Sequence, residues 1–200
     1  MQKNIVALAR ELMRKQTAKN KAPAWLLTEL AVTKGKELAK RHHVDEQLVV
    51  ASLYLAHTIF DPIWKGKIQQ HHPELSAKFV KRHLKKWGVR QSQQDIILNA
   101  IKAHHDDIPT TSKIAEVVKN AECAKFVTVE GSLIWLHELG LRGVPLEEAI
   151  NKVLQKMEQK KHLLTLKDCK QEAQQQCKKI VKLFAALTVS HASDNQLEHN

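Results

Sequence analysis

The sequence predicts an all-α protein that folds as a single compact domain of about eight helices. Long amphipathic segments recur along the 200 residues, and only 6 glycines and 5 prolines interrupt them. The chain contains no Asn-Gly or Asp-Gly pair of the kind that closes a tight β-hairpin. With 43% hydrophobic and 26% charged residues, it has the composition of a globular protein with a sizeable core.

The first two expected helices are amphipathic. One covers residues 2–20 and is expected to form an N-terminal unit ahead of the main helical domain, residues 21–188. The next begins near Pro23, because proline suits the first turn of a helix, and it continues to Arg41.

The third expected helix begins after Asp45, which suits the N-cap position. Residues 48–56 are apolar on almost every side, a pattern typical of a helix buried at the centre of a domain. If this helix continues to Asp61, it places His57 and Asp61 on one face, because helical residues four apart lie above one another.

The later helices are delimited by proline, glycine and capping residues. Their expected first residues are Pro73, Gln91 or Ser92, Thr111 or Ser112, Pro145 and the capping-box residue Thr165. The helix after Thr111 or Ser112 is expected to be long and to end at Leu139, with Gly88 and Gly140 as helix stops. The last helix should end near Leu187, and residues 189–200 should form a flexible tail.

The charge pattern indicates an anionic partner. The formal charge is +11 with histidine neutral, so the surface should attract nucleotides, phosphoesters, nucleic acid or acidic proteins. No local nucleic-acid motif accompanies this charge, and aromatic residues make up only 4% of the chain.

Three cysteines without a CxxC pair indicate free thiols and a reducing cytoplasm. The N-terminal segment has no uninterrupted apolar core followed by a cleavage site, so we expect neither a signal peptide nor a membrane span.

Histidines supply the strongest chemical signal, because the chain has 12 of them and several stand at expected helix ends. These are His57, His72, His104 and His105, and the carboxylate Glu122 follows on the next helix. Imidazole and carboxylate groups are the ligands of Zn, Mn, Fe and Ni, and helical domains build such sites from facing helices.

Four segments follow one another in the order AHTIFD, HPELSAKFVKRHL, IKAHHDDIP and EVVKNAECAKF. This order resembles the HD superfamily of metal-dependent phosphohydrolases over roughly residues 20–188. In that superfamily an apolar helix ends in a His-Asp doublet. Several of its families continue with a helix that opens with His-Pro-Glu and a helix that ends in His-His.

The resemblance implies a ligand set. His57 would be the histidine of the doublet, and Glu122 would stand at the position of the last aspartate ligand. His72 and His104 correspond to the second-metal histidines of some HD families, with His105 as a further candidate.

Two of the four defining ligands differ from the superfamily pattern. Thr58 replaces the aspartate of the doublet, and Leu27 or Thr28 stands where the first histidine is expected. Asp61 and Asp106 are candidate substitutes for the missing carboxylate.

Two classes of function follow from this resemblance. The first is a divergent HD-like protein without the usual metal centre, which needs no cofactor and binds a nucleotide or another phosphorylated or anionic partner. The alternative is a metal-dependent phosphohydrolase that acts on a nucleotide or phosphoester. Its cofactor would be Mn, Fe, Ni, Zn or Mg, held by His57, His72, His104 and Glu122.

In the enzyme alternative, basic side chains near the metal would complete the site. Asp61 and Lys65 are the candidate catalytic residues. Lys65, Lys67 and Lys102 are the candidate ligands of the substrate phosphates. A second alternative, which rests on net charge, is a helical protein that binds nucleic acid.

Overall fold

Helix α3 (Glu46–Leu55) lies at the centre of the computed structural model, which describes residues 4–60, 67–105 and 108–194. Four helices pack against it: α1 (Ile5–Asn20), α2 (Trp25–Arg41), α5 (Gln91–Ala103) and α6 (Lys113–Ala124). Every residue from Leu48 to Thr58 is buried, which confirms the expected central helix. The Asp45 carboxylate accepts hydrogen bonds from the backbone N–H groups of Gln47 and Leu48, which confirms it as the N-cap.

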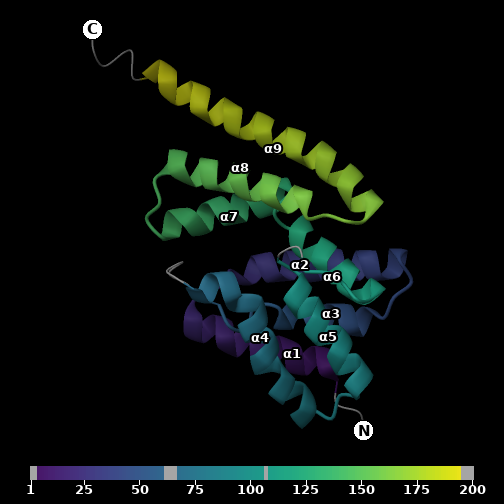
Figure 1. Cartoon of the computed structure of the whole chain (residues 1–200). Coiled ribbons are helices and arrows are strands. Elements are labelled where there is room, and N and C mark those ends of the chain that lie inside the picture. Colours follow the sequence, from purple (N-terminus) through teal and green to yellow (C-terminus); the bar gives the residue numbers. More distant parts are fainter. Residues whose placement is uncertain (1–3, 61–66, 106–107, 195–200) are drawn as a thin grey trace.

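The other helices extend this bundle on two sides. They are α4 (Lys67–Lys86), α7 (Val129–Leu141), α8 (Leu146–His162) and α9 (Lys167–Asp194). Helix α4 packs along α5, and α7, α8 and α9 lie together on one side of the bundle that α1 to α6 form (Figure 1). The residues that the structure describes form nine helices and no strand, so the predicted all-α class is confirmed.

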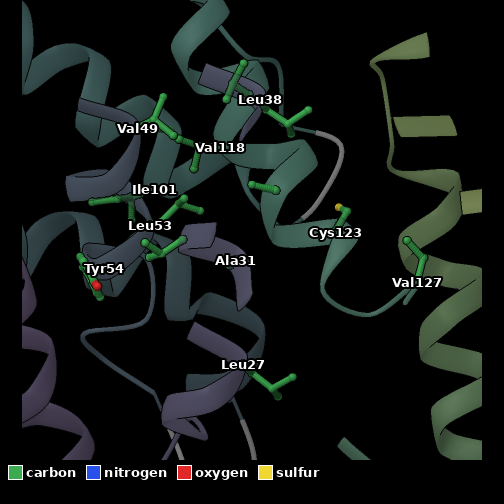
Figure 2. Packing of buried hydrophobic residues seen from close by; sticks show 14 of the residues in the cluster. Leu27, Ala31, Leu38, Val49, Leu53, Tyr54, Ile101, Val118, Cys123 and Val127 are labelled. Carbon is green, nitrogen blue, oxygen red and sulfur yellow. The ribbon is translucent and has the colours of Figure 1, made fainter. Parts of the chain in front are cut away.

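One hydrophobic core joins the helices. Figure 2 shows part of it, with Val49 and Leu53 of α3, Ile101 of α5 and Val118 of α6, all of them fully buried. Helix α1 belongs to the same core and buries Met13. The three cysteines are free and buried, as the sequence predicted.

The expected long helix after Ser112 is wrong, because the chain turns between α6 and α7. Ser112 caps α6, and the Thr128 hydroxyl then accepts the N–H of Gly131 to cap α7. A Cβ atom on Gly131 would overlap the carbonyl oxygen of Lys125, so glycine is needed where the two ends meet. After α7 the left-handed residue is Gly143, with φ of 75°, whereas Gly140 lies inside the helix.

Three further boundaries differ from expectation. Helix α3 ends at Leu55, so His57 lies in the following turn, and Asp61 falls outside the described residues. Helix α4 begins at Lys67 and carries Pro73 inside it. Helix α9 continues to Asp194, beyond the end expected near Leu187.

Candidate functional site

A cavity of about 50 Å³ lies beyond the C-terminal end of α3. Apolar side chains such as Leu27, Phe60 and Phe126 form part of its wall. Its polar lining consists of four histidines, one carboxylate and four cationic side chains: His57, His72, His104, His105, Glu122, Lys125, Arg142, Lys156 and Lys160. Segments far apart in the sequence therefore meet at one point.

The turn that carries His57 is held by hydrogen bonds to its own helix and to α4. The Ser76 hydroxyl accepts the Ile59 N–H at 3.0 Å and lies 3.2 Å from the Ile59 carbonyl oxygen. The Thr58 hydroxyl donates to the carbonyl oxygen of Leu55 at 3.2 Å, so this side chain serves the end of α3. His57 is thereby fixed at the cavity wall.

Three of the predicted metal ligands converge. His57, His72 and His104 are all buried, and each offers a nitrogen atom within 4.8 Å of those of the other two. The rings of His57 and His72 are stacked with centroids 5.1 Å apart, and the His72 and His104 Nε2 atoms are 3.2 Å apart. These three imidazoles could hold one metal ion.

Hydrogen bonding sets the form of His104. Its Nδ1 lies 2.5 Å from the carbonyl oxygen of Ile101, which only accepts, so Nδ1 carries the proton. Burial, and next the neighbouring His57 and His72, hold the pKa of His104 well below its usual range. The ring is therefore neutral, and its Nε2 presents a lone pair toward His72, as in metal-binding histidines.

Glu122 joins His57 to a buried lysine. Its Oε2 lies 2.9 Å from His57 Nε2 and 2.5 Å from Lys125 Nζ. Burial would raise the pKa of Glu122, but the Lys125 ammonium and His57 outweigh burial and hold this pKa well below its usual range. Because the carboxylate only accepts, His57 Nε2 donates to it, which leaves the lone pair of the neutral ring on Nδ1.

A basic part of the cavity lining adjoins the histidine cluster, and His105 packs against His72 with ring centroids 5.0 Å apart. Burial lowers the pKa of His105 to about 2, and Lys160 and Lys156 add to this effect. The Lys160 ammonium donates to the backbone carbonyl of His105 at 3.5 Å, and Lys160 is itself 2% exposed. A neutral imidazole and two lysines thus line the cavity beside the histidine cluster.

Other predicted site residues lie elsewhere. Lys102 is half-buried, does not line the cavity and pairs with Glu74 at 3.9 Å. Three of the predicted residues, Asp61, Lys65 and Asp106, lie outside the described residues. The side chain of Lys67 lies outside them as well. Leu27, at the place of the expected first histidine, lines the cavity with an apolar surface.

Sequence reasoning missed the buried cations Lys125 and Lys160. The spacing of Lys125, three residues after Glu122, was a usable signal, because helical residues three apart lie on one face. Lys160 gave no such signal, because its contact with His105, 55 positions away in the sequence, arises only from the tertiary fold.

No protein-family model matches the chain, and no curated protein matches it either. Solved structures do match over nearly their full length. A Lactobacillus plantarum protein aligns with a TM-score of 0.72 at 15% identity, covering 96% of this chain and 99% of that one. Bacillus subtilis YpgQ in complex with ADP aligns with a TM-score of 0.65 at 14% identity, covering 94% and 96%.

A second crystal structure of Bacillus subtilis YpgQ aligns with a TM-score of 0.67 at 13% identity, covering 93% of this chain and 95% of that one. At such identities the likeness shows a shared helical fold. Among the helices that the structure describes, none combines the length and the apolar character needed to cross a bilayer.

Proposed function

We propose that the chain is a divergent HD-superfamily protein that binds a phosphorylated small molecule of the nucleotide class in the histidine cavity. The observation that carries this proposal is the set of cations on the cavity wall, chiefly Lys125, Lys156 and Lys160. Lysine ammonium groups hold phosphate oxygens as point charges, and they are most effective where water is excluded. The ADP complex of YpgQ, a protein of the same fold, supports the choice of a nucleotide.

The size of the cavity suggests how such a ligand would lie. A volume of about 50 Å³ suits a phosphate group and is well below that of a pocket for a whole drug-sized ligand. Pro23, Phe126 and Lys156 on the wall are only half-buried. The phosphate would enter the cavity between the lysines, and the nucleoside would remain at this half-buried side.

ADP should raise the melting temperature of the metal-free protein, whereas adenosine, which has no phosphate, should not. Lys156→Gln should weaken ADP binding about tenfold, because one charge-assisted contact to phosphate is lost. Thermal denaturation in EDTA measures the first effect, and isothermal titration calorimetry in EDTA measures the second.

The matched control is Lys152→Gln on the same helix, whose exposed ammonium pairs with Glu148 at 3.1 Å. It should bind ADP as the unaltered protein does. Equal binding of ADP and adenosine, or equal loss in the two lysine variants, would refute recognition of phosphate in this cavity.

A second candidate function is metal-dependent phosphoester hydrolysis. The observation in its favour is the convergence of His57, His72 and His104, together with two buried atoms that lack a hydrogen-bond partner, His57 Nδ1 and Glu122 Oε1. This nitrogen-rich donor set fits Mn, Fe, Ni or Zn; Mg prefers an all-oxygen shell and fits poorly. A divalent ion held there would polarise a phosphoryl oxygen and lower the pKa of a bound water.

In this second function the chain's own groups have defined tasks. The Ile101 carbonyl fixes the ring of His104, and the lysines would hold the phosphate. The purified protein should then contain close to one equivalent of Mn, Fe, Ni or Zn, and His104→Gln should lose both this metal and any ADP hydrolysis. Elemental analysis and a phosphate-release assay test it, and a metal content unchanged in His104→Gln would contradict it.

Nucleic-acid binding, the third expectation from the sequence, has no observation in its favour among the described residues or in the comparisons.

A further inference from the structure

The Lys125 ammonium lies between a carboxylate and an imidazole, two groups of the kind that bind metal ions in proteins. Its Nζ lies 2.5 Å from Glu122 Oε2 and 3.5 Å from His57 Nε2. The side chains of Lys125 and Glu122 are 3% and 2% exposed. Burying two charges costs more desolvation energy than an apolar pair of the same size would, so stability alone is a weak reason for this pair.

The surroundings of the pair point to a ligand. Lys125, Glu122 and His57 all line the cavity. Among the contacts of the described residues, the Lys125 ammonium donates to Glu122, lies 3.5 Å from His57 Nε2 and lies 5.2 Å from the centre of the Phe126 ring, and an ammonium carries three donors. His57 Nε2 donates to Glu122, so the contact of Lys125 with this nitrogen is only electrostatic, and at least one ammonium donor can serve an incoming anion.

The same geometry opposes a metal ion at Glu122. Lys125 and His57 both hydrogen-bond Glu122 Oε2, so a divalent ion would have to bind this carboxylate through Oε1, and it would stand close to a fixed positive charge. An ion at the three histidines would bind His57 through Nδ1, the nitrogen that has no hydrogen-bond partner, because His57 Nε2 already contacts Glu122 and Lys125.

We propose that Lys125 is a tethered cation that neutralises Glu122 and receives the phosphate of the bound ligand without a metal ion. The inference rests on the proposed binding function. It adds that the Lys125 ammonium takes the place of a metal ion at Glu122. It assigns the Glu122 end of the cavity to a permanent ammonium, so that only the three histidines can accept an exchangeable ion.

The first test compares ADP binding in EDTA and in Mn²⁺. The unaltered protein should bind ADP equally in both. Lys125→Met should lose affinity on the order of 30-fold in EDTA, as expected for truncation of a buried charged partner. Mn²⁺ should restore much of that loss, because Glu122 can then bind the ion.

The matched control is Lys119→Met, on the same helix. Lys119 is 6% exposed and its ammonium donates to the Ile108 carbonyl at 3.4 Å, but it does not line the cavity. This variant should bind ADP as the unaltered protein does. A requirement of the unaltered protein for Mn²⁺, or full ADP affinity of Lys125→Met in EDTA, overturns the inference.

The second test uses Mn²⁺ alone and needs no phosphorylated ligand. Mn²⁺ should raise the melting temperature of Lys125→Met by several degrees more than that of the unaltered protein. The double variant Lys125→Met, Glu122→Gln removes both charges, which preserves the fold, and it should lose this extra shift. Equal shifts in all three proteins overturn the inference.

The two tests separate the inference from the function on which it rests. If neither the unaltered protein nor any variant binds ADP, in EDTA or in Mn²⁺, the proposed nucleotide-binding function is wrong. The Mn²⁺ shifts then still decide whether Lys125 holds the cation position at Glu122.

Discussion

Gly131→Ala should destabilise the protein by about 3 kcal/mol, whereas Gly140→Ala in the same helix should stabilise it slightly. A Cβ atom on Gly131 would overlap the carbonyl carbon and oxygen of Lys125, and a backbone carbonyl cannot move away by changing a rotamer. The backbone of the turn between α6 and α7 must therefore shift. The same shift displaces Lys125 and with it the ion pair to Glu122, so ADP binding should fall together with stability.

Gly140 provides the matched control. A Cβ atom there meets no other atom within 4 Å, and alanine is the better helix former, so the gain should be about 0.5 kcal/mol. Urea denaturation followed by circular dichroism gives both free energies of unfolding. Equal stabilities of Gly131→Ala and the unaltered protein would show that the turn has room for a side chain.

This turn marks a limit of prediction from sequence. The break in the expected long helix contains no proline or glycine, and its apolar residues Phe126 and Val127 continue the helical pattern. The sequence features that mark the break are Thr128, which caps α7, and Gly131, which lies against the backbone of Lys125. Both can be interpreted in this way only once the chain is known to turn here. The central helix was predictable because its apolar character and the Asp45 cap are local properties.

The candidate site also contains residues that the sequence predicts, the histidines, and residues that it does not, the lysines. The order of histidine segments resembled a known arrangement, and this order correctly implied that His57, His72 and His104 lie close together. Lysines gave no comparable signal, because Lys is almost never fully buried without a partner and is assigned to the surface by default. Lys102 was predicted as a phosphate ligand and Lys125 was not considered, yet the side chain of Lys102 is 44% exposed and that of Lys125 is 3% exposed.

Acidification should destabilise the protein, because below pH 6.5 the histidines of the unfolded chain bind protons while burial keeps the cavity histidines of the folded chain neutral. Burial lowers the pKa of His57, His104 and His105 in the folded chain, so the unfolded chain binds more protons at every pH below 6.5. Stability should be level above that pH. At pH 5 the loss should be about 2 kcal/mol for each histidine that stays neutral in the folded protein.

Glu122 acts in the same direction at lower pH. Its folded pKa lies well below 4.5, so the stability that its charge contributes is present above pH 4.5 and is lost as the pH falls through the folded pKa. The loss between pH 7 and pH 5 therefore reports chiefly on the histidines.

The contribution of His105 to this pH dependence of stability can be measured separately. Because its folded pKa is about 2, His105→Gln should reduce the stability difference between pH 7 and pH 5 by about 2 kcal/mol. His162→Gln is the control, since that side chain is 80% exposed and should leave the difference unchanged. Urea denaturation in EDTA at both pH values measures the effect. An identical pH dependence for His105→Gln and the unaltered protein would show that His105 is protonated in the folded state. Water would then have to reach Lys156 and Lys160 well enough for this part of the cavity to hold a third positive charge.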